Sequence, residues 1–127
     1  MAAKPTALKQ TTADSGPPSV LGMELDPQSG YSRIRVHMSR PANFDSHMLK
    51  NPDRLYIDIF DAQVANQLAR KDWGIRDVRI RDVRLGKQGE TGTRIVFDLT
   101  QPVLYSVLHD LHRSELIIEL RDLPTKK

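Results

Sequence analysis

The chain has 127 residues, a formal net charge of +3 and no cysteine. This length fits one domain with its own hydrophobic core, and the absence of cysteine excludes a disulfide framework and thiolate metal sites. The charge does not indicate nucleic-acid binding, because the basic excess lies at the two ends of the chain. Two lysines precede residue 19 and two follow residue 124, with Asp14 as the one acidic residue there, so residues 19–124 are neutral.

The ends of the chain differ in composition from its middle. Residues 1–18 are rich in Ala, Thr, Ser and Pro and predict a flexible linker, and residues 125–127 predict a tail, which leaves a domain at 19–124. No apolar run approaches the ~18 residues of a membrane-spanning helix. Residues 1–5 lack the apolar segment of a secretory signal. We expect no membrane span, and either an intracellular protein or a sequence that starts after a removed signal.

Short apolar alternations separated by turn residues follow one another along the domain. The first four predicted strands or extended segments are residues 20–25, 34–38, 43–49 and 55–59. Residues 62–73 are the only plausible helix, at most two turns long, and they form the connection to the second half. The strand pattern then returns at residues 78–85, 93–100, 103–109 and 115–120. The order predicts an all-β protein.

The second half of the chain repeats the first. An offset of 61 residues (94 − 33) aligns residues 33–41 with 94–102 and residues 55–59 with 116–120, and upstream the register slips by one residue. We therefore predict a β-sandwich of two sheets of about four strands each, related by the internal repeat with pseudo-twofold symmetry. Each half should contribute about four strands, the usual size of one sheet. One short helix or turn should form the connection.

The repeat also aligns charged residues of opposite sign. Arg33 falls on Arg94, and Asp58 falls on Glu119. A symmetric sandwich needs the same strand pairings twice, so this equivalence favours two structural cross-strand ion pairs over contacts to a ligand.

Four segments together resemble the AMIN domain family. They are the strand at residues 31–36, the run Leu-Lys-Asn-Pro-Asp-Arg-Leu-Tyr-Ile-Asp-Ile at 49–59, residues 78–86 and residues 93–99. The Asn-Pro-x-Arg-Leu-x-Ile-Asp portion is the most specific, and the ordered set covers roughly residues 20–122. AMIN domains are found beside bacterial cell-wall amidases and in type IV pilus secretins.

The resemblance implies a symmetric two-sheet sandwich that binds peptidoglycan, has no catalytic activity or cofactor of its own, and localises a larger protein in the cell envelope or periplasm. We expect the larger protein to be an N-acetylmuramoyl-L-alanine amidase. The alternative is a protein-interaction domain of a type IV pilus secretin or another envelope assembly. We expect a monomer whose signal peptide is absent from this sequence.

The residues themselves indicate no catalysis. The four histidines (His37, His47, His109 and His112) show no paired spacing typical of a metal site, and they read better as surface or edge residues. The sequence contains no Gly-x-Ser-x-Gly motif, and residues 86–89 lack the spacing of a phosphate-binding loop.

A tandem pentapeptide is the first candidate for ligand binding. Residues 76–80 read Arg-Asp-Val-Arg-Ile and residues 81–85 read Arg-Asp-Val-Arg-Leu. We expect its apolar residues (Val78, Ile80, Val83 and Leu85) to face inward, with a β-bulge between Ile80 and Val83. Arg79 and Arg84 should then point outward near Lys87, where they could bind wall carboxylates. The alternative is that these arginines pair with neighbouring acids or protect a sheet edge.

Arg54 and Tyr56 are the second candidates. Arg54 has no basic counterpart, because the repeat places Glu115 at its position. Tyr56 and Phe60 fall on the polar phase of their strand, where an aromatic ring could stack on a sugar or could pack under the 62–74 connection. Trp73 is expected to cover the core of the sandwich rather than to bind a glycan.

The tails generate one prediction. Deleting residues 1–17 and 125–127 should leave the melting temperature within experimental scatter, because these segments carry no apolar periodicity. Differential scanning calorimetry measures this, and a large drop would mean that the N-terminal segment pairs with a sheet.

Overall fold

The computed structural model describes residues 17–64, 72–89 and 91–124. The expected linker and tail lie almost wholly outside these residues. The expected helix at 62–73 lies mostly outside them as well. Its first residues are described, and they are not helical: Gln63 instead forms an isolated parallel bridge with Ser19. Within the described residues, no helix has the length and apolar character that crossing a membrane requires.

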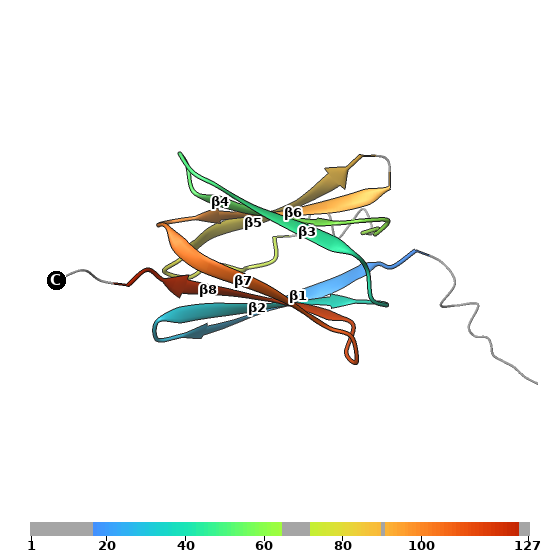
Figure 1. Cartoon of the computed structure of the whole chain (residues 1–127), viewed down its shortest axis with the longest axis horizontal. Helices are drawn as coiled ribbons and strands as arrows, with labels where there is room; N and C mark the ends of the chain where they lie inside the picture. The colour runs from blue at the N-terminus through green and yellow to red at the C-terminus, as the bar shows by residue number, and fades with distance from the viewer. Residues whose placement is uncertain (1–16, 65–71, 90, 125–127) are drawn as a thin grey trace, which may run out of the picture.

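The described residues form eight strands. They are β1 (Val20–Gln28), β2 (Tyr31–Met38), β3 (Phe44–Leu49), β4 (Arg54–Ile59), β5 (Ile80–Gln88), β6 (Gly92–Leu99), β7 (Val103–Asp110) and β8 (Glu115–Asp122). They form two antiparallel four-stranded sheets with the orders β1-β2-β8-β7 and β3-β4-β6-β5. The two sheets lie face to face as two layers (Figure 1). The expected all-β sandwich of two four-stranded sheets is confirmed.

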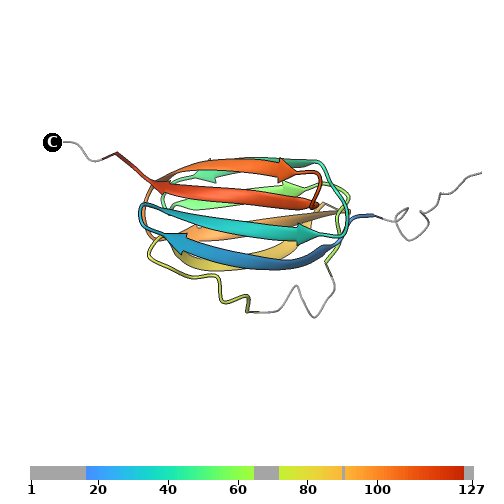
Figure 2. The ribbon, with the colours of Figure 1, turned by 90° about the horizontal axis from the view of Figure 1, so that it is seen from below.

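The internal repeat relates one sheet to the other. When β1–β4 are exchanged with β5–β8 in order, the sheet β1-β2-β8-β7 becomes β5-β6-β4-β3, which is the second sheet. Each half does contribute four strands, but the implied assignment of one half to one sheet is wrong, because each half gives two strands to each sheet. After its first hairpin each half crosses to the opposite layer, at Pro41 and at Pro102, and proline cannot donate a ladder hydrogen bond that would continue the strand. Figure 2 shows the first of these sheets from its outer side.

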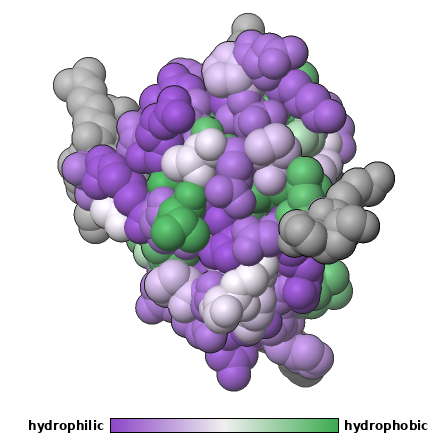
Figure 3. Space-filling model, turned by 90° about the vertical axis from the view of Figure 1, so that its left-hand side faces the viewer, coloured by the Kyte–Doolittle hydropathy of each residue, from purple (hydrophilic) through white to green (hydrophobic). Residues whose placement is uncertain are grey.

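The core lies between the two layers and follows the period-two pattern of the sequence. Eight apolar residues at the inward positions of the central strands have no exposed surface: Ile34, Val36, Ile57, Ile59, Ile95, Phe97, Ile118 and Leu120. Burial of this apolar area is the main stabilising contribution to such a fold. At the end of the molecule where β8 leaves the sandwich, hydrophilic residues dominate the surface and apolar areas are small and separate (Figure 3).

Backbone hydrogen bonds outside the strands repeat with the same symmetry. Met38 N donates to Ser114 O at 2.9 Å, and the equivalent Leu99 N donates to Asp53 O at 3.0 Å. These twin bonds hold the end of each central strand to the turn that precedes a strand of the other half. The repeat therefore extends from the sequence to the details of chain connection.

Phe97 is the largest fully buried side chain and provides a test of this core. Phe97→Ala should lower the free energy of unfolding by about 3–5 kcal/mol, because the lost ring leaves a cavity between two packed sheets. Urea denaturation measures the change. The exposed Leu21→Ala serves as the control and should change stability by less than about 0.5 kcal/mol.

Candidate functional site

The outer face of the sheet β3-β4-β6-β5 brings together most of the predicted ligand-binding residues. In β4, Leu55, Ile57 and Ile59 point into the core, so the alternate positions of the strand point outward. The pairing register places Tyr56 opposite Val96 of β6, and Val96 opposite Arg84 of β5. Arg54, Tyr56, Arg84 and Arg94 therefore share one surface, which we call the Tyr56 face.

Two guanidinium groups lie close to the ring of Tyr56. The Arg94 guanidinium carbon is 4.6 Å from the ring centroid, and that of Arg54 is 5.8 Å from it. Both distances are within the range of cation–π attraction, which is worth roughly 0.5–1 kcal/mol at exposed sites. Tyr56 is half-buried, whereas Phe60 on the same phase is exposed. The predicted outward phase of Tyr56 in β4 is confirmed, and Phe60, the residue after the strand, is exposed as its phase predicts.

Two of the three arginines of the Tyr56 face form ion pairs with carboxylates. Arg84 donates from Nε and Nη2 to the two carboxylate oxygens of Asp98, each at 3.0 Å. Arg94 donates in the same two-pronged way to Asp58, at 2.7 and 3.0 Å. Arg54 makes no ion pair with any described residue, and its buried Nε has no hydrogen-bond partner among them. The Arg54 guanidinium is thus the cation of this face that a ligand carboxylate could bind without displacing an acidic residue.

The predicted outward position of Arg79 is wrong. Its side chain is only 4 % exposed and reaches across the sandwich to the other sheet. Its Nε and Nη2 donate to Asp122 at 2.8 and 3.0 Å, and its Nη1 donates to Ser32 Oγ at 3.1 Å. The hydrogen bonds to Asp122 raise the pKa of Arg79 and lower that of Asp122. Arg79 therefore joins the two sheets.

The error has a structural cause in the position of β5. This strand begins at Ile80, so the preceding residues do not follow its alternation, and Val78, predicted to face inward, is 72 % exposed. The expected bulge is confirmed as a register shift between Ile80 and Asp82. Ile80 and Val83 are buried as predicted, and Leu85 is half-buried against the core.

Lys87 is exposed but does not join the Tyr56 face. It pairs with the buried Thr93 across the ladder and so has the opposite phase from Arg84. Lys87 instead lines a cavity of about 470 Å³ beside the turn after β4, together with Asp61 and Thr91. The structure thus brings three of the five predicted residues together, Arg54, Tyr56 and Arg84, and separates Arg79 and Lys87 from them.

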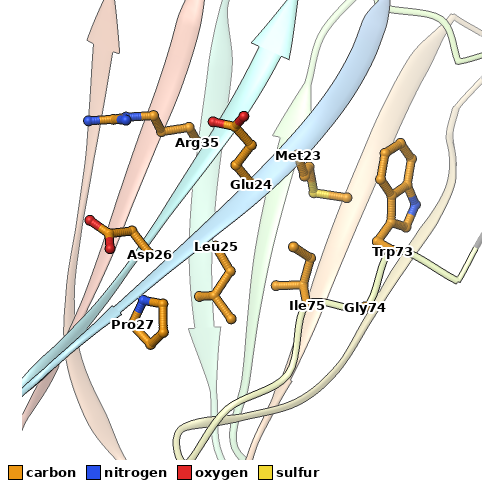
Figure 4. Close-up of a pocket in the computed structure, with 9 residues that line it drawn as sticks. All are labelled: Met23, Glu24, Leu25, Asp26, Pro27, Arg35, Trp73, Gly74 and Ile75. Carbon is orange, nitrogen blue, oxygen red and sulfur yellow. The ribbon is translucent and has the colours of Figure 1, made fainter.

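A groove of about 580 Å³ runs along the outer edge of β1. Met23 and Leu25 form one side, and Trp73 and Ile75 form the other (Figure 4). Trp73 is half-buried and packs against the core, so its predicted role as a cover of the sandwich is confirmed. This groove therefore belongs mainly to the packing of the 72–79 segment on the sandwich.

Sequence reasoning missed two contributors to the Tyr56 face. Arg94 was assigned to an ion pair alone, yet it also lies close to Tyr56. His47 Nε2 lies 3.5 Å from Asp58 and 3.8 Å from Asp45, on the strand next to Tyr56. The alternation of β3 could have placed His47 outward. No group of three or more His, Cys, Asp or Glu side chains among the described residues could hold a metal ion.

The ion pairs predicted from the repeat are both present. Arg33 lies opposite Glu119 and donates to it at 2.7 Å, as Arg94 lies opposite Asp58. The Arg94 hydrogen bond lowers the pKa of Asp58, and the Arg33 hydrogen bond lowers that of Glu119. The structural interpretation of the equivalent charges is confirmed.

Comparison with known proteins gives a consistent result. The family model of the AMIN domain matches residues 22–120. The N-acetylmuramoyl-L-alanine amidase AmiC of Escherichia coli O6:H1 is 31% identical over 86 residues, which are 66% of this chain and 21% of that protein. AmiC of Neisseria meningitidis serogroup B is 29% identical over 87 residues, or 67% of this chain and 21% of the relative. The chain thus spans about a fifth of the length of these relatives.

The lowered pKa of Asp58 generates a prediction about pH. The stabilisation from this carboxylate should be complete above the ordinary carboxyl pKa of ~4 and should be lost as the pH falls through the lower folded-state pKa. Asp58→Asn should therefore cost about 1–3 kcal/mol at pH 7 and should reduce the loss of stability between pH 5 and 2. Thermal melting across this range measures both effects, with Asp45→Asn as the exposed control. If Asp58→Asn lost as much stability between pH 5 and 2 as the unchanged protein, the stabilising role of the ionised Asp58 would be contradicted.

Proposed function

The chain belongs to the AMIN domain family, and from this we propose that it is a non-catalytic module that binds peptidoglycan and localises a larger bacterial protein in the cell envelope. The family match covers residues 22–120, which is nearly the whole sandwich. The two amidases match over about a fifth of their length. We assign hydrolysis to a separate zinc amidase domain of the larger protein, and the periplasm or cell envelope as its location.

We propose that the Tyr56 face is the binding surface, and the observation that carries this is the unpaired Arg54 beside Tyr56. Peptide stems of the wall end in carboxylates, which an arginine binds with two parallel hydrogen bonds. An aromatic ring next to the cation offers an apolar surface on which a sugar ring can stack. Arg54 makes no ion pair with any described carboxylate, although Asp98 lies opposite it in the ladder and pairs with Arg84 instead, and Tyr56 is half-buried.

Arg84 extends this surface, and its use by a ligand would disrupt only an exposed ion pair of the protein. Its side chain is 56% exposed, and its pair with Asp98 lies at the surface, where such pairs contribute little to stability. A ligand carboxylate can therefore compete with Asp98 for the Arg84 guanidinium. Arg79 is outside the proposed surface because it is buried, and Lys87 because it lies on the opposite phase of β5.

The proposed surface predicts a specific loss of binding. Arg54→Ala combined with Arg84→Ala should reduce retention on purified peptidoglycan sacculi at least severalfold, because two cations that face carboxylates are removed. The free energy of unfolding should change by less than about 1 kcal/mol per site, since the ion pair of Arg84 lies at the surface and Arg54 makes no ion pair with a described residue. Retention by the unchanged protein should also weaken as salt rises from low to physiological strength, where charges are screened over ~8 Å.

Arg113→Ala combined with Arg121→Ala is the matched control, since it removes the same charge from the other sheet and its turn. Equal losses from both double variants would indicate diffuse electrostatic adhesion and would contradict a specific site. Loss from neither would overturn the Tyr56 face and would favour docking to an envelope protein, as in a pilus secretin. Tyr56→Ala then separates stacking from charge, because it leaves all three arginines in place.

A further inference from the structure

The strand β7 forms an open edge of the sandwich. It is the last strand in the order β1-β2-β8-β7, and no other described strand pairs with its outer side. In Figure 2, β7 lies on the free margin of the sheet, whereas the 72–79 segment runs beside β1 on the opposite margin. Such an edge presents a row of backbone N–H and C=O groups that another strand can bind.

The other three edge strands carry features that discourage pairing. β1 contains a register shift near Gly22 and a proline at position 27, and Trp73 and Ile75 lie alongside it. β5 contains a register shift and three basic residues, and β3 spans only six residues with outward Asp45 and His47. β7 has eight residues in regular register with no proline and no basic Lys or Arg. By these criteria β7 is the least protected edge.

Two outward side chains of β7 are apolar, although the fold does not require apolar residues at these positions. Leu104 is 50% exposed and Leu108 is 59% exposed, with Ser106 between them. Ile117 of β8 lies next to Leu108 and continues the apolar surface. The repeat places Asn43, Asp45 and His47 at the positions equivalent to Leu104, Ser106 and Leu108. Because β3 makes the same kind of edge with polar residues, the leucines of β7 are not needed for folding.

We propose that β7 pairs antiparallel with β7 of a second copy of this chain, about a twofold axis at Ser106. The outward sequence Leu104–Ser106–Leu108 reads the same in both directions, so an antiparallel copy places Leu104 opposite the other copy's Leu108 and serine opposite serine. In this register the core-facing residues of both copies stay on the same side of the joined sheet, because side chains alternate between the two sides along each strand. The result is a continuous eight-stranded sheet with an isologous interface. This proposal replaces the expectation of a monomer and does not depend on peptidoglycan binding.

The pairing should be weak and reversible. One pair of eight-residue edges buries less than the ~1,200–2,000 Å² of a stable interface, so we expect a dissociation constant of roughly 10–1,000 µM. Two copies held on one surface would experience a far higher effective concentration than in solution, and weak pairing would then be sufficient.

Sedimentation velocity tests the surface. The weight-average mass of the whole chain should rise toward that of a dimer between about 10 µM and 1 mM, as expected for an interface of this size. Leu104→Lys with Leu108→Lys should keep the protein monomeric. The control is Leu21→Lys with Leu49→Lys, which adds the same charge at exposed leucines of β1 and β3. This control should still form the dimer. A monomer at every concentration, or equal effects of the two double variants, would overturn the proposal.

Cross-linking tests the register, because the chain contains no cysteine. Ser106→Cys places two thiols opposite each other at the twofold axis, within the Cα separation that a disulfide spans. Mild oxidation should convert it to a covalent dimer about tenfold faster or more than Asp45→Cys, which occupies the equivalent exposed position on β3. Equal rates for the two variants would overturn the proposed register. Circular dichroism confirms that both variants are folded before the comparison.

Discussion

The structure depends on two strand pairs that join one half of the chain to the other. Among the strands that the structure describes, four of the six pairings are formed within a half, and only β2–β8 and β4–β6 connect the halves. Each of these two pairs carries an arginine directly opposite a carboxylate, Arg33 with Glu119 and Arg94 with Asp58. The charges fix the register at the centre of each connection, and a slip of one residue would separate both charges and expose the core face.

The symmetric interior carries two different outer faces. Where the Tyr56 face has Arg54 and Tyr56, the repeat places Glu115 and Ile117 on the other sheet. Glu115 is buried and lies 2.8 Å from His37 Nδ1, whereas Arg54 makes no ion pair among the described residues. The interior requires both sheets to be alike, but it leaves their outer residues free to diverge. The differences between equivalent positions therefore identify residues that folding alone does not explain.

Period-two alternation made the core predictable, because inward and outward phases are properties of each strand alone, and the internal repeat indicated the structural role of the central charged residues. The assignment of strands to sheets was not predictable in this way, since β1 and β5 have the same hydropathy pattern whichever layer they join. Arg79 was misplaced because it precedes β5 and its direction is set by Asp122, which is distant in sequence and close only in the folded state. The gathering of Arg54, Tyr56 and Arg84 required the registers of β4–β6 and β5–β6, which the sequence did not indicate.

The exchange of strands between layers also governs how the chain can fold while it is being synthesised. The first half can form only the hairpins β1–β2 and β3–β4, because β2 pairs next with β8 and β4 pairs next with β6. A hairpin alone is at best marginally stable in water. The sheet β3-β4-β6-β5 cannot be completed before β6 has been made, and the sheet β1-β2-β8-β7 cannot be completed before β8, the last of the described strands, has been made. Until these strands are made, each hairpin lacks its final neighbouring strand and part of the sheet that finally covers its apolar side. A nascent chain of this kind depends on rapid completion, or on a chaperone that holds it, to avoid aggregation.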